Sequence, residues 1–230
     1  MNKIAITGKS SRFAKILSKF FNGENIIYTS KNQIDILNIK SIERFIKLKK
    51  IKTLIHLAGL SRPMDMHEKN IIKSIDLNII GTANVVKVCK KYNVKLIFFS
   101  TNYVYSGIKG PYNEQDPLLP FNNYGWSKLG AESAVQMYKN SLILRISMTE
   151  RPFIHKKAYK NVISSFIFQD KFASHFRKLL NHKGIINIGG ERRSIFSFAK
   201  KSNKKIKSIL SKSVYLDTSI DITKFKSIIK

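Results

Sequence analysis

Short apolar runs alternate with longer segments of helical periodicity over the first two-thirds of the chain, and this alternation constrains the fold most. The runs at residues 3–7, 26–29, 53–57, 95–100 and 142–146 have the length and composition of buried strands. Strands that are joined through helices pair in parallel by right-handed crossovers. The sequence therefore predicts an α/β fold with a doubly wound parallel sheet, in which ligands bind at the carboxyl ends of the strands.

The alternation weakens after residue 146, and this change sets the expected domain organisation. Residues 150–152, Glu-Arg-Pro, interrupt the pattern. Beyond them, the sequence indicates only helical stretches, a short strand at 185–188 and a terminal helix from Asp221. We therefore expect a sheet domain over residues 1–147 and a short C-terminal region over residues 148–230 that packs on it.

The charge of the chain is strongly basic. Forty-two Lys and Arg residues face 14 Asp and Glu residues, which gives a formal net charge of +28. Such a charge attracts anions, including nucleotides, nucleic acids and lipid surfaces. The basic residues are nevertheless spread along the chain, and Ile and Asn are also abundant, so we interpret the charge as compositional drift. It predicts no specific nucleic-acid partner.

Apolar content and cysteine usage narrow the class of protein. Hydrophobic residues make up 43% of the chain, enough for a sizeable core, which excludes global disorder. The single cysteine, Cys89, cannot form an internal disulfide, as is usual in a reducing compartment. The apolar run at 4–6 is too short for a signal peptide or a membrane span. We expect a cytoplasmic protein without membrane contact.

The turn between the first strand and the first helix is suited to phosphate binding, because helix N–H groups and the helix dipole favour an anion there. A dinucleotide-binding turn usually has three glycines. Here only Gly8 remains, and Ser11 and Ala14 occupy the later positions, so a plain strand-to-helix turn is an alternative. The candidate cofactor-binding residues of the turn are Gly8, Lys9, Ser10, Ser11, Arg12 and Phe13.

The ends of the next two strands add further candidates. NAD-selective proteins usually have an acid after the second strand, whereas Ser30 and Lys31 stand here and could hold a 2′-phosphate. The sequence thus favours NADPH, with NADH and a solvated turn as alternatives. His56 is interpreted as a packed histidine, and no histidine has metal-ligand spacing, so we expect no metal. The candidates in these segments are Ser30, Lys31, Asp35, Ile36, Leu57, Ala58 and Gly59.

Tyr124 and Lys128 are the candidate catalytic pair. Their four-residue spacing on a predicted helix puts both on one face, where the ammonium would lower the phenol pKa from about 10. Tyr124 could then exchange a proton with a substrate oxygen. Tyr105 and Lys109 have the same spacing but span a glycine turn, so we discard them. Thr101, at the end of the preceding strand, adds a hydroxyl to the pair.

Several segments together resemble the dTDP-4-dehydrorhamnose reductase family, which belongs to the extended short-chain dehydrogenase/reductase class. They are Ser-Thr-Asn-Tyr-Val-Tyr at 100–105, Pro-Tyr-Asn-Glu-Gln-Asp at 111–116 and Tyr-Gly-Trp-Ser-Lys-Leu-Gly-Ala-Glu at 124–132. The first turn and Asn-Ile-Ile-Gly-Thr at 78–82 also match. The resemblance covers about residues 3–145. It implies a Rossmann-type fold that binds NAD(P) through residues 1–147, with a shortened substrate-binding region over 148–230.

By this resemblance the chain is an NADPH-dependent reductase of a nucleotide-linked 4-keto sugar. Tyr124 donates the proton to the keto oxygen, Lys128 binds the nicotinamide ribose and tunes Tyr124, and Thr101 hydrogen-bonds the reacting oxygen, while hydride goes to C4. The resemblance also implies that Asn78, Ser100 and Lys128 contact the cofactor. It implies that Asn102, Tyr103 and Arg145 contact the substrate.

Two other functions stay open at this point. Asn102 stands where the reductase usually has Asp, but Asn102-Tyr103 is still closer to a reductase than to the acidic pair of a dehydratase. A sugar-nucleotide epimerase or dehydratase, which retains NAD, is one alternative. The other is a non-catalytic dinucleotide-binding regulatory subunit, which suits Ser11, Ala14 and the shortened C-terminal region. The chain could also form a homodimer.

Overall fold

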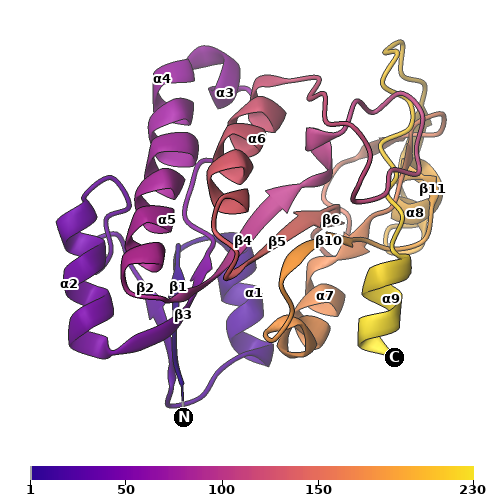
Figure 1. Ribbon diagram of the computed structural model, residues 1–230. Helices are drawn as coiled ribbons and strands as arrows, with labels where there is room; N and C mark the ends of the chain where they lie inside the picture. The colour runs from indigo at the N-terminus through magenta and orange to yellow at the C-terminus, as the bar shows by residue number, and fades with distance from the viewer. Residues whose placement is uncertain (1) are drawn as a thin grey trace.

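A six-stranded parallel sheet forms the centre of the protein. We describe it from a computed structural model of residues 2–230. The strand order is β10-β5-β4-β3-β1-β2, and every neighbouring pair is parallel (Figure 1). The strands are β1 (Lys3–Thr7), β2 (Ile26–Thr29), β3 (Ile51–His56), β4 (Lys95–Thr101), β5 (Ser141–Ile146) and β10 (Gly184–Ile188). The expected doubly wound α/β fold is therefore confirmed.

Helices cover both faces of this sheet, as crossovers between parallel strands require. Helices α2 (Ile39–Lys49), α5 (Gly81–Lys91) and α6 (Asn123–Gln136) stand in a row on one side (Figure 1). Helices α1 (Arg12–Phe20) and α7 (Gln169–His175) pack against each other on the other side, where α9 (Thr223–Ile229) contacts β10. Each side has its own buried apolar cluster. The doubly covered strands explain the uninterrupted apolar runs in the sequence.

The segment between β3 and β4 has apolar residues at helical spacing over residues 68–92, but it does not form one continuous helix. It divides into α3 (Met66–Lys69), α4 (Ile71–Ser74), a π-helix η1 (Ile75–Ile80) and α5. Asn70 lies between α3 and α4, and its side chain accepts from the Lys73 N–H, so it begins a new helix. A π-helix keeps near-helical spacing, which is why the sequence pattern did not reveal it. Such turns occur frequently at functional sites.

The C-terminal part contributes to the main sheet and also forms small sheets of its own. Strand β10 lies beyond residue 147 and pairs with β5, so the central sheet draws on both sides of the expected domain boundary. Three two-stranded sheets and a third apolar cluster complete this part. Its other elements are β6 (Met148–Thr149), β7 (Lys157–Tyr159), β8 (Ile163–Ser164), β9 (Ile167–Phe168), η3 (Phe176–Leu179), β11 (Arg193–Ser194), α8 (Ile195–Lys200) and β12 (Lys207–Ile209).

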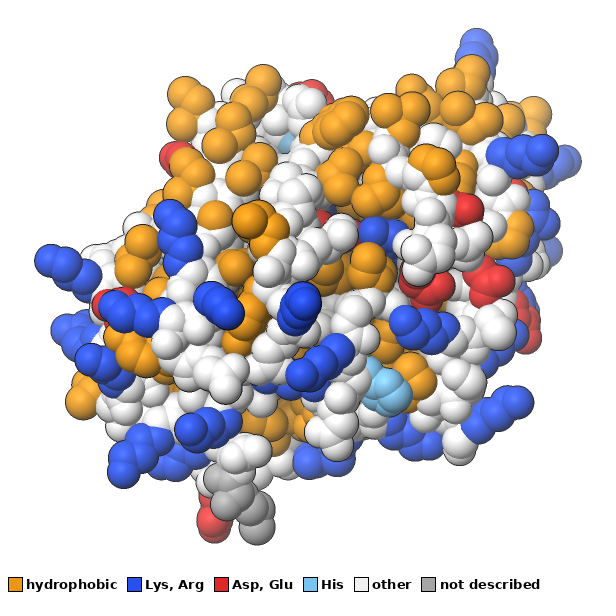
Figure 2. Space-filling view, in the orientation of Figure 1, with side chains coloured by type: hydrophobic (Ala, Val, Ile, Leu, Met, Phe, Trp, Pro, Cys, Tyr) orange, Lys and Arg blue, Asp and Glu red, His pale blue; other side chains and the backbone are white. Residues whose placement is uncertain are grey.

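On the face of the protein shown in Figure 2, the positive charge is dispersed. Lys and Arg side chains are scattered over the face shown in Figure 2, and hydrophobic side chains gather along its top. A dispersed distribution is what compositional drift predicts, whereas a nucleic-acid-binding face concentrates its basic residues. Among residues 2–230, no helix is both long and apolar enough to cross a membrane.

Candidate functional site

The candidate site lies at the carboxyl edge of the sheet, where the order of the strands reverses. Strand β1 has β2 on one side and β3 on the other, so the loops after β1 and β3 diverge from this point. Ligands of open α/β sheets bind in the crevice that such a reversal creates. Thr101, at the end of β4, belongs to the same edge. The predicted residues of the first turn, the β3 loop and the catalytic segment are therefore brought to one side of the sheet.

The turn after β1 can receive a dinucleotide diphosphate. Gly8 has φ +78°, and a Cβ there would lie 2.9 Å from the Ala58 nitrogen, so glycine is required where the two loops meet. Ser11 caps α1 by accepting from the Ala14 N–H at 3.1 Å. The backbone N–H groups of Ser10, Arg12 and Phe13 have no protein acceptor among residues 2–230. Free N–H groups at a helix N-terminus bind phosphate oxygens, so this turn fits the diphosphate although two glycines are missing.

A second wall of the crevice is built around Asn78, which lies in the π-helix η1. Its side chain accepts from the Leu60 N–H at 2.7 Å and donates to the Leu60 carbonyl at 2.9 Å. The same amide donates to Ser127 Oγ at 2.8 Å, and Ser127 donates to the Tyr124 carbonyl. Asn78 thus fixes the loop after β3 to the first turn of α6. Its side chain is 2% exposed, so Asn78 shapes the site from within.

His56 forms a buried hydrogen-bonded link at the end of β3. Thr7 Oγ1 accepts from the Leu57 and Ala58 N–H groups, so its own proton is directed to His56 Nδ1 at 2.9 Å. The other ring nitrogen, Nε2, then donates to Thr82 Oγ1 at 3.1 Å. Burial and the charge of Lys128 lower the His56 pKa to about 3, which keeps the ring neutral. The interpretation of His56 as a packed residue is confirmed.

The residues that were expected near the adenosine end of the cofactor differ in exposure. Ser30 and Lys31 are exposed at the end of β2, and Ser30 contacts the side chain of Gln33. Asp35 accepts from the Leu37 N–H at 3.0 Å, so its carboxylate organises the loop. Ile36 is 5% exposed and packs where a Gly81 Cβ would be. The Ile36 side chain therefore belongs to the core, and its contact with a cofactor stays a prediction.

Tyr124 lies in the first turn of α6, which Asn122 caps by accepting from the Gly125 N–H at 2.8 Å. A Cβ on Gly125 would collide with the Tyr103 carbonyl oxygen, so glycine permits the helix to approach the loop after β4. The Tyr124 ring lies 5.0 Å from the ring of His67. Burial raises the pKa of Tyr124 to about 12, against a hydrogen bond from Thr101 that lowers it. The Thr101 hydroxyl thus lies near the Tyr124 hydroxyl.

Lys128 follows Tyr124 by one helical turn, but it does not act on the phenol as expected. Its ammonium lies 4.1 Å from the centre of the Phe98 ring on β4. Burial lowers the pKa of Lys128 to about 7, and the charge of Glu132 opposes this shift. The pKa of Tyr124 is raised rather than lowered, and the cation that opposes the rise is Arg62. The expectation that Lys128 lowers the pKa of Tyr124 is therefore wrong for the protein alone.

Arg145, which the family resemblance predicts to contact the substrate, is part of a buried ion pair in this structure. Its guanidinium donates to Glu132 at 2.6 and 3.0 Å, to the Tyr105 hydroxyl at 2.8 Å and to the Glu114 carbonyl at 3.1 Å. The exposed fractions of Arg145 and Glu132 side chains are 2% and 0%. The other oxygen of Glu132 accepts from Ser100 Oγ at 2.7 Å. The Ser100 hydroxyl therefore belongs to this internal network.

The other expected substrate contacts lie on either side of the chain after Thr101. Asn102 is buried and donates to the Thr218 carbonyl at 3.0 Å, which ties the C-terminal part to the site. Tyr103 is partly exposed, and its ring lies 5.2 Å from Phe121 and 6.2 Å from Tyr124. Of these two side chains, only that of Tyr103 is open to a substrate in this conformation. Asn102 instead fixes the loop through its bond to Thr218, and its contact with a substrate stays a prediction.

Sequence reasoning missed Arg62 and Glu150 and assigned no partner to Arg12. Arg12 and Arg62 both donate to Glu150 Oε1, at 3.0 and 3.1 Å. One feature of the sequence could have drawn attention to Arg12 and Arg62: arginine is scarce in this chain, since only eight of its 42 basic residues are Arg. Arginine retained in so lysine-rich a chain marks positions where a planar, forked donor is needed.

His67 was also missed. It is fully buried, bonds Ser74 through Nδ1 at 2.7 Å, and its Nε2 has no hydrogen-bond partner among residues 2–230. Burial lowers its pKa, and Glu68 opposes that shift. The sequence pattern does not distinguish His67 from a surface histidine, because it does not predict the short helix α3 in which His67 is buried.

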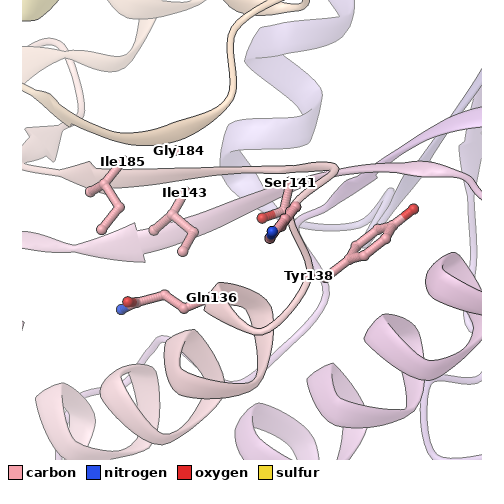
Figure 3. Close-up of a pocket in the computed structure, with 7 residues that line it drawn as sticks. Gln136, Tyr138, Ser141, Ile143, Gly184 and Ile185 are labelled. Atoms are coloured by element: carbon pink, nitrogen blue, oxygen red, sulfur yellow. The ribbon is translucent and has the colours of Figure 1, made fainter.

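A shallow hollow elsewhere on the protein is separate from this site. It lies between the end of α6 and the amino ends of β5 and β10, lined in part by Tyr138, Ser141 and Gly184 (Figure 3). This is the opposite edge of the sheet from Thr101. The Tyr138 hydroxyl donates to the Cys89 and Val94 carbonyls, so it has a structural role. Within residues 2–230, no group of three His, Cys, Asp or Glu side chains is placed to hold a metal.

Comparison with known proteins agrees with this geometry. The family described as RmlD substrate binding domain matches residues 1–163. A dTDP-D-glucose 4,6-dehydratase of Dictyostelium discoideum is 30% identical over 207 residues, which are 73% of this chain and 48% of that protein. The chain therefore spans about half the length of this curated relative.

Two solved structures have the same architecture along nearly the whole chain. A hypothetical dTDP-4-dehydrorhamnose reductase from Sulfolobus tokodaii is 26% identical, with a TM-score of 0.86 and coverage of 98% of this chain and 94% of that one. The dTDP-4-dehydrorhamnose reductase of Bacillus anthracis, solved in complex with NADP, is 20% identical, with a TM-score of 0.85 and coverage of 99% and 92%. The latter identity supports the fold alone.

Proposed function

We propose that this chain is an NADPH-dependent reductase of a nucleotide-linked 4-keto sugar. It belongs to the family described as RmlD substrate binding domain. The observation that carries the proposal is the proximity of the Thr101 and Tyr124 hydroxyls at the carboxyl edge of the sheet, beside a turn with free N–H groups. The name of the Sulfolobus tokodaii protein, a hypothetical dTDP-4-dehydrorhamnose reductase, supports the same activity.

Tyr124 is the proposed proton donor. The bound nicotinamide supplies hydride to C4 of the sugar, and the keto oxygen then needs a proton. A phenol whose pKa is raised to about 12 holds its proton at neutral pH, which suits a donor in the reductive direction. Thr101 hydrogen-bonds the same oxygen and orients it. Neither role requires the phenol to be ionised.

The residues of the turn and of the β3 loop are the proposed cofactor site. Gly8 and the free N–H groups of Ser10, Arg12 and Phe13 would hold the diphosphate. Ser30 and Lys31 are exposed and would contact the adenosine 2′-phosphate, which supports NADPH over NADH. Lys128, one turn after Tyr124, would contact the nicotinamide ribose. Gly59 and Ala58 would let the cofactor lie close to β3.

One alternative function has a specific observation in its favour. The Dictyostelium discoideum relative is a dTDP-D-glucose 4,6-dehydratase, and an enzyme of that kind would retain its cofactor through the reaction. Against this alternative, no acidic pair follows Thr101, since Asn102 and Tyr103 stand there. Glu150 does not supply the missing acid, because it is already paired with Arg12 and Arg62.

Oxidation of NADPH and NADH with dTDP-, UDP- and GDP-linked 4-keto sugars tests the proposal. We expect stoichiometric NADPH consumption with at least one of them. Tyr124→Phe should lower the rate by a factor of about 100 or more, as for the loss of a general acid. Tyr92→Phe is the matched control, because it removes the hydroxyl of a tyrosine at the end of α5 whose ring faces the Lys47 and Lys91 ammoniums. Binding of NADPH without turnover on any of these sugars would contradict the proposal and favour a non-catalytic subunit.

A further inference from the structure

Two arginines from different loops of the crevice converge on one carboxylate. Arg12 begins α1 directly after the glycine turn, and Arg62 lies in the loop that follows β3. Both donate to Glu150 Oε1, at 3.0 and 3.1 Å. The side chains of Arg12 and Arg62 are 64% and 40% exposed, whereas that of Glu150 is 14% exposed. A largely covered anion therefore holds two accessible cations together across the reversal point of the sheet.

This arrangement is exceptional within the protein. Four other arginines pair with carboxylates, and each has a carboxylate to itself. In the described residues, Glu150 is the one carboxylate that two arginines share. Two guanidinium groups on one carboxylate leave an excess positive charge, and the two like charges repel each other. The cluster is therefore incomplete as a salt bridge and suited to a further negative charge.

The surroundings of the cluster identify the chemistry of that charge. The free N–H groups of Ser10, Arg12 and Phe13 lie at the Arg12 end. At the other end, the charge of Arg62 reaches the Tyr103 and Tyr124 hydroxyls, since it acts to lower the pKa of both. Guanidinium forks bind phosphate oxygens in the same bidentate way as they bind carboxylates. A ligand with two linked phosphates would satisfy both arginines at once.

We propose that Arg12 and Arg62 form a receptor for the diphosphate of a nucleotide ligand, and that Glu150 occupies it as an internal carboxylate until phosphate displaces it. The inference rests on the proposed function, because the dinucleotide and the nucleotide sugar both carry a diphosphate. Glu150 keeps the arginines in position without ligand, but it also competes with the ligand. Removing its charge should therefore strengthen binding of diphosphates.

Equilibrium binding of NADPH, dTDP and inorganic pyrophosphate to the full chain tests this inference. Glu150→Gln should bind pyrophosphate and at least one of the nucleotides about fivefold more tightly than the natural protein. The matched control is Glu43→Gln, which removes the same charge from the Glu43–Lys91 pair on α2 and α5. Because both variants raise the net charge by one, general electrostatic attraction predicts the same small change in both. Equal affinities of the two variants, or weaker binding by Glu150→Gln, would overturn the inference.

The arginine variants identify the source of the diphosphate. Arg12→Met and Arg62→Met should both weaken binding of NADPH more than binding of dTDP if the dinucleotide occupies the receptor, and both should weaken binding of dTDP more if the nucleotide sugar does. Arg62→Lys keeps the charge but loses the fork, so a loss of about fivefold in pyrophosphate affinity is expected. If Arg62→Lys and Arg12→Met both bound pyrophosphate as tightly as the natural protein, the receptor would be contradicted, even if Glu150→Gln failed to fold.

Failure of the proposed function is distinguishable from failure of this inference, because no binding measurement requires turnover. Tighter pyrophosphate binding in Glu150→Gln without reduction of any keto sugar would support the receptor and contradict the reductase. Reduction of a keto sugar, together with unchanged pyrophosphate binding in Glu150→Gln, would support the reductase and contradict the receptor. Absence of pyrophosphate and nucleotide binding in the natural protein would overturn the receptor.

Discussion

The Lys128 ammonium lies 4.1 Å from the centre of the Phe98 ring, one helical turn beyond Tyr124. A cation against an aromatic face is attracted by the ring quadrupole, but this contact does not replace the water that burial removes. Burial therefore lowers the pKa of Lys128 to about 7. Near neutral pH, small changes in pH or in nearby charge therefore decide whether Lys128 is protonated.

Lys128→Met should remove a pH dependence of stability. The Lys128 pKa is about 7 in the folded protein and 10.5 in its ordinary state, so between these values the unfolded chain binds a proton that the folded chain has released. The contribution of Lys128 to the free energy of unfolding therefore rises with pH across this window. Urea denaturation should find the variant more stable than the natural protein at about pH 7, with the difference shrinking toward pH 10. Parallel stability curves would contradict this account.

Tyr124 should ionise late in the protein without ligands. Burial raises its pKa to about 12, whereas the sequence pattern predicts a phenol that ionises near neutral pH. Ultraviolet difference titration of the natural protein against Tyr124→Phe isolates the tyrosinate signal of this residue. We expect that signal only above about pH 11, beyond the range of ordinary exposed tyrosines. A tyrosinate signal near pH 7 would restore the expected effect of Lys128.

Gly125→Ala should damage the site through geometry. The added methyl group would collide with the Tyr103 carbonyl oxygen, so the first turn of α6, and Tyr124 with it, must shift. We expect a loss of about 1–3 kcal/mol in stability and a marked loss of turnover. Gly130→Ala is the matched control on the same helix, because its methyl group would meet the flexible end of the Ile79 side chain. Equal losses of stability and turnover in the two variants would contradict the inference that the close contact of Gly125 with the Tyr103 carbonyl positions Tyr124.

Glu132→Gln should destabilise the fold. The variant leaves the Arg145 guanidinium buried without its counter-charge, which costs about 3–5 kcal/mol. Glu43→Gln breaks a more exposed pair with Lys91 and should cost less than about 1 kcal/mol. Thermal or urea unfolding of both variants measures the difference. A Glu132→Gln variant no less stable than Glu43→Gln would show that the buried pair contributes little.

The central sheet was predictable because each strand is a continuous apolar run that both layers of helices bury. The first helix was equally clear, since Ser11 is its N-cap as well as part of the turn. The start of the second helix is harder to predict, because Ser41 is also a typical capping residue whereas Asn38 holds the N-cap position. Asn and Ser have similar capping propensities, so the pattern alone could not decide between them.

The network around the site was less predictable, because it depends on contacts between residues far apart in the sequence. Arg145 was assigned to the substrate on the family pattern, but its partner Glu132 lies on α6 and its partner Tyr105 follows β4. The link between Arg12 and Glu150 spans 138 positions. No periodicity carries such information, and only the tertiary fold brings these charges together.

The most direct test of the account uses NADPH carrying deuterium in its transferable position, with the keto sugar that supports turnover. We predict one deuterium at C4 of the product for each NADPH oxidised, with release of NADP. Tyr124→Phe should bind both ligands and transfer deuterium about 100-fold more slowly or worse. Product formed without deuterium at C4, or with the cofactor retained and unchanged, would contradict the reductase assignment.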